Sequence, residues 1–243
     1  MAKQRIDTLL AQKALVDSRE RAKILVMAGA VYVEGQRVLK PDQQIDVNAH
    51  VEVRPGALPY VGFGGTKLKH AFETFSLSAQ GKKALDVGSS TGGFVDYMLQ
   101  GGATRVYAVD VGIHQLHEKV RSDPRVVLLE GVNARYLTRQ QVGEDVDIIT
   151  VDVSFISLKK ILPVLVPLLH QGAVLVTLVK PQFEVGRYHV GKGGIVKDQE
   201  RVNAVIEDIK NFGQSLGLRP VGVTEAPREK ERKNREYFIQ WEL

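Results

Sequence analysis

Residues 84–94 constrain the fold of this chain more than any other segment. They read ALDVGSSTGGF, in which an apolar strand runs into a turn of glycine and hydroxyl residues and then into a helix. Gly88, Gly92 and Gly93 let the backbone approach a ligand closely at the carboxyl end of this strand, where open α/β sheets bind nucleotides. The spacing is not the dinucleotide motif G-x-G-x-x-G. It is not a phosphate loop either, because no Gly-Lys-Ser/Thr follows.

The alternation of strand, turn and helix continues along the rest of the chain. Separated by helical segments, apolar strands are expected over residues 83–87, 106–111, 126–130, 147–151 and 173–179. Such an order specifies a parallel α/β sheet of the Rossmann type, covered on both faces. The apolar run 161–179 is interrupted by two prolines and a glycine. It therefore predicts helix, turn and buried strand rather than one membrane helix.

The first part of the chain follows a different pattern. Apolar residues at helical spacing predict two helices, the second over residues 19–27 with Ser18 as its N-cap and Gly29 at its end. A strand over Val31–Val33 leads into a Glu-Gly turn, and residues 47–53 alternate as a half-buried strand does. These elements predict a small α+β domain.

A linker and the overall charge complete the domain picture. Two prolines and a glycine in residues 54–59 predict a linker, so we expect one domain over 1–59 and another over 60–243. The net charge of +5 points to an anionic partner, either nucleic acid or an acidic membrane surface. The absence of cysteine and of a signal-peptide pattern fits a cytoplasmic protein.

The second strand ends in a carboxylate that suits a nucleoside. Asp110 lies 24 residues after Asp86, where it can accept both hydroxyls of an adenosine ribose, although it could instead only cap a turn. Asn133 follows the third strand, close to where the adenine is expected. The predicted cofactor contacts are Asp86, Gly88, Ser89, Ser90, Gly92, Gly93, Phe94, Asp110, Asn133 and Phe155.

Several motifs carry a resemblance to a known family. They are LDVGSSTGGFVDYMLQGGA, VDVSFISL, LVKPQFEVG and NREYF. Together they resemble the TlyA family, once called hemolysins, whose studied members are ribosomal RNA 2′-O-methyltransferases of the FtsJ-like class. SRERAKILVMAGAVYVEGQRVLKPD resembles the small RNA-binding domain first seen in the fourth protein of the small ribosomal subunit. The resemblance implies S-adenosyl-L-methionine as cofactor and cytidine in ribosomal RNA or ribosomal subunits as substrate. Gly62-Phe63 replaces the family's usual Ser-Arg, and residues 225–235 replace a glycine-rich loop.

The resemblance also implies a catalytic Lys-Asp-Lys-Glu set. Ribose methylation needs an in-line attack by a weakly acidic hydroxyl, which a nearby base or cation assists. Lys180 is expected to be the base or oxyanion stabiliser and Lys67 to orient it, whereas a lone surface lysine would more often be solvated. The matching residues are Lys67, Asp152, Lys180 and Glu236.

Basic residues in two places are candidate RNA contacts. One group lies in the first helices and the other just before Glu236, and a solvated face is an equally common use of such charges. The predicted contacts are Lys3, Arg5, Arg19, Arg21, Lys23, Arg232, Lys233 and Arg235. Neither a metal nor membrane insertion is expected to be required.

Three alternatives remain. A ribosome assembly factor with an inactive methyltransferase domain would be recognised by a failure to bind the cofactor. A hemolysin would need an amphipathic membrane helix, which the sequence does not predict. A base or small-molecule methyltransferase would more often carry acidic, Asn-Pro or cysteine-based sites than paired lysines.

Overall fold

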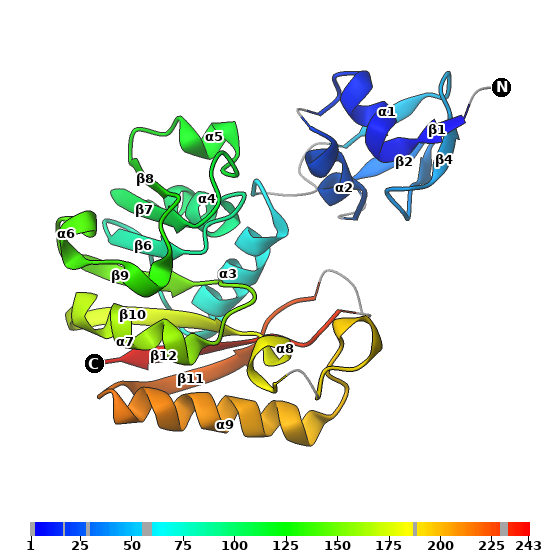
Figure 1. The fold of residues 1–243 in the computed structure, drawn as a ribbon. Helices are drawn as coiled ribbons and strands as arrows, with labels where there is room; N and C mark the ends of the chain where they lie inside the picture. Colours follow the sequence, from blue (N-terminus) through cyan, green and yellow to red (C-terminus); the bar gives the residue numbers. More distant parts are fainter. Residues whose placement is uncertain (1–2, 17, 28–29, 55–59, 187–188, 229–232) are drawn as a thin grey trace. The chain divides into compact units, whose positions relative to one another are not determined.

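The computed structural model divides the chain into two compact units, Met1–Phe63 and Gly64–Leu243. It describes residues 3–16, 18–27, 30–54, 60–186, 189–228 and 233–243 (Figure 1). The division falls in the first turn of α3 (Phe63–Thr74), slightly beyond the boundary expected at residue 59. Gly29, most of the expected linker and Arg232 lie outside the described residues.

The first unit combines two helices with short antiparallel strands. β1 pairs with β4, and β2 lies between β3 and β5. The predicted cap of the second helix is confirmed, because the Arg21 N–H donates to Ser18 Oγ at 3.1 Å. The elements are β1 (Lys3–Arg5), α1 (Ile6–Gln12), α2 (Arg19–Met27), β2 (Val31–Val33), β3 (Gln36–Arg37), β4 (Gln44–Asp46) and β5 (Val51–Val53).

The strand predicted over residues 47–53 is wrong in its first half. Residues 47–50 form a turn between β4 and β5, where the Asn48 N–H donates to the Asp46 carboxylate at 2.9 Å. An aspartate side chain that bonds the backbone two residues on favours a turn over an extended strand. The alternating pattern is therefore divided between a turn and β5.

A mostly parallel seven-stranded sheet forms the centre of the second unit. Its order is β11-β12-β10-β9-β6-β7-β8, and β12 runs antiparallel to both of its neighbours. The five predicted strands are present with small shifts at their ends. The strands are β6 (Lys83–Val87), β7 (Arg105–Asp110), β8 (Val126–Glu130), β9 (Val146–Val151), β10 (Leu169–Val179), β11 (Arg219–Glu225) and β12 (Tyr237–Glu242).

Helices cover both faces of this sheet. One face packs against α7 and α9 in a shared apolar core, and Figure 1 shows α9 running along β11 and β12. The other face carries α3 and α4, since Phe94 of α4 contacts Phe238 of β12 and Phe72 of α3 contacts Tyr97 of α4. The remaining helices are α4 (Gly93–Gln100), α5 (Glu118–Arg121), α6 (Arg139–Val142), α7 (Leu162–Leu165), α8 (Pro181–Glu184) and α9 (Gln199–Ser215).

The packing of α9 shows why this sequence folds as it does. Its buried residues recur at helical spacing, and the Asp198 side chain caps its start by accepting from the N–H groups of Glu200 and Arg201. A Cβ on Gly213 would lie 2.4 Å from the Trp241 ring, so the helix can approach β12 only through a glycine. In the part of the chain that the structure describes, no helix is long and apolar enough to cross a membrane.

Candidate active site

The first predicted catalytic pair lies just beyond the carboxyl ends of β9 and β10. Lys180 Nζ is 2.5 Å from Asp152 Oδ1 and donates to Ser154 Oγ at 2.8 Å. The two charged side chains are only 11% and 21% exposed. Both are mostly shielded by protein yet still reached by solvent, so a substrate hydroxyl could approach them.

The second predicted pair joins a helix to the last strand. Lys67 Nζ on α3 lies 2.5 Å from Glu236 Oε2, with exposed side-chain fractions of 19% and 17%. The backbone carbonyl of Glu236 also accepts the Ala226 N–H at 2.8 Å, which fixes the residue at the start of β12. Neither residue is a freely solvated surface charge.

Strand register places the two pairs on the same face of the sheet. Leu178 pairs with Phe238 across β10 and β12, and residues directly opposite in an antiparallel pair point to the same face. Lys180 and Glu236 continue these two alternations one step further. Phe238 contacts α4, so this face is the one covered by α3 and α4.

A pocket of about 970 Å³ opens beside the Lys180–Asp152 pair. This volume is in the range of sites that bind small organic ligands. Five of the ten predicted cofactor contacts line it, together with the catalytic candidate Asp152. The five are Gly88, Ser90, Asp110, Asn133 and Phe155.

The glycine turn lies very close to the backbone of Asp152 at the pocket wall. Gly88 has φ 89°, and a Cβ there would lie 2.4 Å from the carbonyl oxygen of Asp152. The N–H groups of Ser90 and Gly112 each donate to one oxygen of the Asp110 carboxylate at 2.7 Å. Asp110 therefore does brace its turn, and each oxygen retains a lone pair that could accept a ribose hydroxyl.

The other predicted cofactor contacts lie behind the turn rather than on the pocket wall. Ser89 is buried and its hydroxyl donates to the Val109 carbonyl at 3.0 Å. Gly92 has φ 92° and packs against Leu116, while Gly93 lets α4 approach α3. Phe94 is in the core. These residues shape the turn, and none of the four lines the pocket.

Asp86 is the most perturbed of these residues. It is fully buried, and Thr150 Oγ1 donates to its Oδ1 at 2.6 Å, whereas Oδ2 has no hydrogen-bond partner among the described residues. Burial, with a smaller contribution from the carboxylates of Asp152 and Asp110, raises the pKa of Asp86 to about 7 against the opposing effect of the hydrogen bond from Thr150. Near neutral pH this carboxyl group therefore exists in both its protonated and its ionised form, whereas an ordinary aspartate is ionised.

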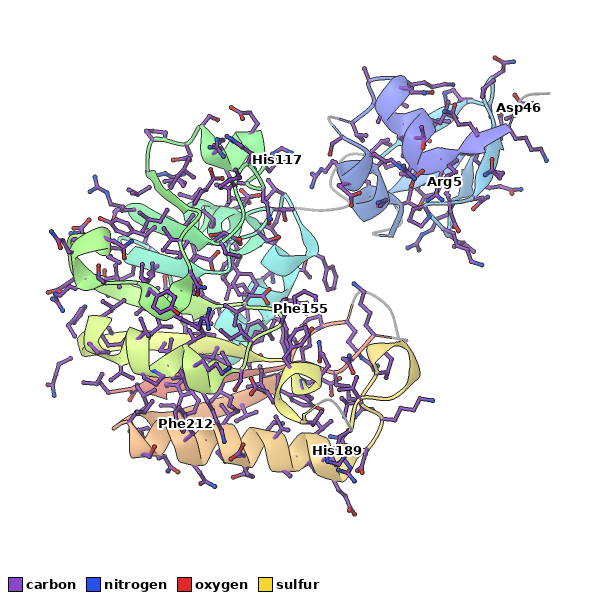
Figure 2. All side chains as sticks on the ribbon, viewed as in Figure 1. Arg5, Asp46, His117, Phe155, His189 and Phe212 are labelled. Atoms are coloured by element: carbon purple, nitrogen blue, oxygen red, sulfur yellow. The ribbon has the colours of Figure 1, made fainter. Side chains whose placement is uncertain are left out.

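Sequence reasoning missed several residues that line the pocket, and three of them lie close to the catalytic candidates in sequence. Ser154 accepts from Lys180, and Gln182 and Phe183 line the pocket. Phe155 is 90% exposed with φ 64°, and its ring centroid lies 5.0 Å from that of Phe183; Figure 2 shows it next to α8. All three missed residues stand in the same motifs as Asp152 and Lys180, which is the signal that could have identified them.

Most of the predicted RNA-binding cations of the first unit have partners within the protein. Arg5 and Arg19 both bind the buried carboxylate of Asp7. The hydrogen bond from Arg5 lowers the pKa of Asp7 to about 2, although burial of Asp7 acts in the opposite direction. Arg21 donates to the carbonyls of residues 60 and 61, and Lys23 binds Glu20. Lys3 is exposed.

The predicted contacts near Glu236 have a different setting. Lys233 and Arg235 line a second pocket in the larger unit, and Arg232 lies outside the described residues. Within the described ranges, no cluster of three or more His, Asp or Glu side chains is placed to hold a metal ion.

Comparisons with known proteins cover the whole length of the chain. An FtsJ-like methyltransferase model matches residues 60–243, and an S4 domain model matches residues 4–51. The 16S/23S rRNA (cytidine-2′-O)-methyltransferase TlyA of Mycobacterium tuberculosis is 42% identical over 237 residues, which cover 97% of this chain and 88% of that protein. YqxC of Bacillus subtilis is 45% identical over 226 residues, which cover 93% of this chain and 80% of that protein. A solved Streptococcus thermophilus protein classed as a hemolysin has a TM-score of 0.77 and 41% identity, covering 100% of this chain and 89% of that chain.

Proposed function

Since this chain belongs to the TlyA family of FtsJ-like methyltransferases, we propose that it methylates the 2′-hydroxyl of a ribose in ribosomal RNA with S-adenosylmethionine as donor. A cytidine acceptor is part of the proposal, because the Mycobacterium tuberculosis relative is named for cytidine. The observation that carries it is the ion pair between Lys180 and Asp152, because Asp152 lines the pocket. The presence of this pair together with the Lys67–Glu236 pair supports an active domain over one that has lost activity.

The groups that line the pocket suit S-adenosylmethionine. Asp110 offers carboxylate oxygens to ribose hydroxyls, and the close approach of backbone at Gly88 leaves room where a side chain would block the turn. S-adenosylmethionine supplies, when bound, a methyl group on a sulfonium that an oxygen can attack. We assign Asp110, Gly88, Ser90 and Asn133 to holding it and Phe155 to the rim of the site.

The lysine pairs act on the acceptor. As an ammonium group held by Asp152 and Ser154, Lys180 is positioned to stabilise the negative charge that develops on the attacking 2′-oxygen. To act instead as the base, Lys180 would first release one proton to solvent, and its neutral amine would then take the proton of the 2′-hydroxyl. Lys67, held by Glu236, orients the acceptor ribose from α3. These roles need no metal ion.

The first unit is assigned to RNA binding. An S4 domain model matches most of it, and Lys3 provides an exposed positive charge. Arg5, Arg19, Arg21 and Lys23 can still present part of their charge to phosphates, but each also has an intramolecular partner. Its contribution is expected to be affinity for the substrate rather than chemistry.

Two measurements test this function. Ribose methylation is mapped in ribosomal RNA from cells with and without the protein, and the site found is then built into an RNA substrate with either ribose or 2′-deoxyribose. Lys180→Met should lower turnover by about a hundredfold or more with unchanged affinity for S-adenosylhomocysteine. Lys83→Met is the matched control, because Lys83 is also paired with a carboxylate, Glu144, at the opposite edge of the sheet. Methyl transfer to the 2′-deoxy substrate would exclude the ribose as acceptor.

A further inference from the structure

A second pocket in the larger unit is strongly basic. It has a volume of about 760 Å³ and lies between the start of α9 and the segment that precedes β12. Its lining includes four basic residues and no acidic one. They are Lys197, Arg228, Lys233 and Arg235. A concave surface of this charge attracts anions.

Hydrogen bonds join the two walls of this pocket. Asn234 Oδ1 accepts the Val196 N–H at 2.8 Å, and Asn234 Nδ2 donates to the Gly194 carbonyl at 2.7 Å. Arg235 Nη1 donates to Gln199 Oε1 at 2.9 Å, which ties the same segment to α9. The basic side chains are therefore carried by a connected scaffold, not by two independent loops.

Lys197 is the cation of this pocket whose charge is available to a ligand. The carboxylate of Glu225 lies 3.6 Å from Arg228 Nε and 3.9 Å from Arg235 Nε, and the carboxylate of Asp198 binds Arg201. Lys197 is exposed and forms no ion pair with any residue that the structure describes. The start of α9 is already capped by Asp198, so the attraction for an anion comes from the side chains.

The basic pocket is next to a proposed catalytic residue in the sequence. Asn234 and Arg235 immediately precede Glu236, which holds Lys67. Arg235 donates a hydrogen bond to Gln199 of α9, whereas Glu236 forms an ion pair with Lys67 of α3. Two successive residues therefore contact helices on opposite faces of the sheet. An RNA strand that places one ribose at Lys180 could pass a neighbouring phosphate over this edge.

We infer that the pocket lined by Lys197, Arg228, Lys233 and Arg235 is a subsite for a backbone phosphate of the RNA substrate near the acceptor ribose. The inference rests on the proposed function for the identity of the RNA. It adds a place where the catalytic unit itself grips the strand, and it gives Asn234 the role of holding that place in shape.

Salt dependence of RNA affinity tests the subsite. The full chain is titrated onto a ribosomal RNA fragment chosen for its protection by the protein, at several salt concentrations. Lys197→Gln should reduce the slope of log affinity against log salt by about 0.7–0.9, equivalent to a fivefold to tenfold loss of affinity near 0.1 M salt. Lys82→Gln, at the amino edge of the sheet, is the control and should change neither quantity.

Neutral linkages identify the phosphate. The same fragment is made with a single methylphosphonate at each linkage flanking the acceptor in turn. At one linkage the neutral group should weaken wild-type binding as much as Lys197→Gln does, and the variant should then have no further effect. Additive losses at every linkage, or an unchanged salt slope, would overturn the subsite. So would a pocket that binds inorganic phosphate while the variant binds RNA normally. These are binding measurements, so a wild-type protein that binds the RNA without methylating it would contradict the proposed function and not the subsite.

Discussion

Replacing Asp86 by asparagine should remove a pH dependence from the stability of the larger unit. The folded protein keeps a proton on this buried carboxyl up to a pKa of about 7, whereas the ordinary pKa of an aspartate is 3.8. Between these two pH values the unfolded chain has released the proton and the folded chain has not. The free energy of unfolding therefore falls as pH rises through this window, and the loss is complete above pH 7.

The size of the effect follows from the difference between the two pKa values. At 1.36 kcal/mol per pH unit, moving from 3.8 to about 7 corresponds to roughly 4 kcal/mol. An asparagine side chain at this position would carry no charge at any pH and would still accept the hydroxyl hydrogen of Thr150. The part of the window above pH 5 accounts for about 3 kcal/mol, so the variant should gain that much on the wild type between pH 5 and pH 8.5.

Urea unfolding followed by tryptophan fluorescence is the appropriate assay. The chain has a single tryptophan, Trp241, buried in the larger unit, so the signal reports that unit alone. Thr150→Val is the companion variant. It removes the hydroxyl that supports the ionised carboxylate, and should therefore destabilise the protein more at pH 8.5 than at pH 5. A stability difference between wild type and Asp86→Asn that stays constant from pH 5 to 8.5 would refute the reasoning.

Three further predictions concern the site. Asp110→Ala should weaken S-adenosylhomocysteine binding about tenfold or more, through lost bonds to a charged acceptor, and calorimetry showing unchanged affinity would remove Asp110 from the cofactor site. Lys67→Met and Glu236→Gln should each slow methyl transfer, and the double variant should be no slower than the slower single one, because the two residues act as one pair; additive losses would separate their roles. Gly88→Ala should lose more stability in urea unfolding than Gly81→Ala, since both have positive φ but only Gly88 has a backbone carbonyl within 2.4 Å of the added Cβ. Equal losses would mean that the close approach is not limiting.

The central strands were predictable because burial on both faces makes them continuous apolar runs. β6 to β9 match the expected segments within a residue at their ends. β10 begins at Leu169, four residues before the predicted start at 173, because its first residues include the more exposed His170 and Gln171 and a register shift that no apolar pattern marks. β11 contains Pro220 and Gly222 and stands at the edge of the sheet, where the composition of strands is least typical.

The site was predictable as a set of motifs but not as a set of contacts. Sequence order places Asp86 and Gly88 two residues apart, yet one faces a closed core and the other a ligand pocket. Which residue of a turn lines the pocket depends on backbone angles that neighbouring elements impose. Arg5 and Arg19 show the same limit for charge, because their shared partner Asp7 became evident only when the first unit was folded.

The alignment of β10 with β12 limits how this protein can change length. Val179 stands opposite Tyr237, and the residues that follow and precede them carry the lysine and the glutamate of the two pairs. Insertions in the turn between α9 and β11, residues 216–218, leave that alignment intact, so this turn is free to diversify among relatives and to receive engineered segments. Deletion of one residue inside β12 would turn Glu236 to the α9 side and separate it from Lys67. Variation in chain length is therefore expected to concentrate in the loops and to be absent from the last strand.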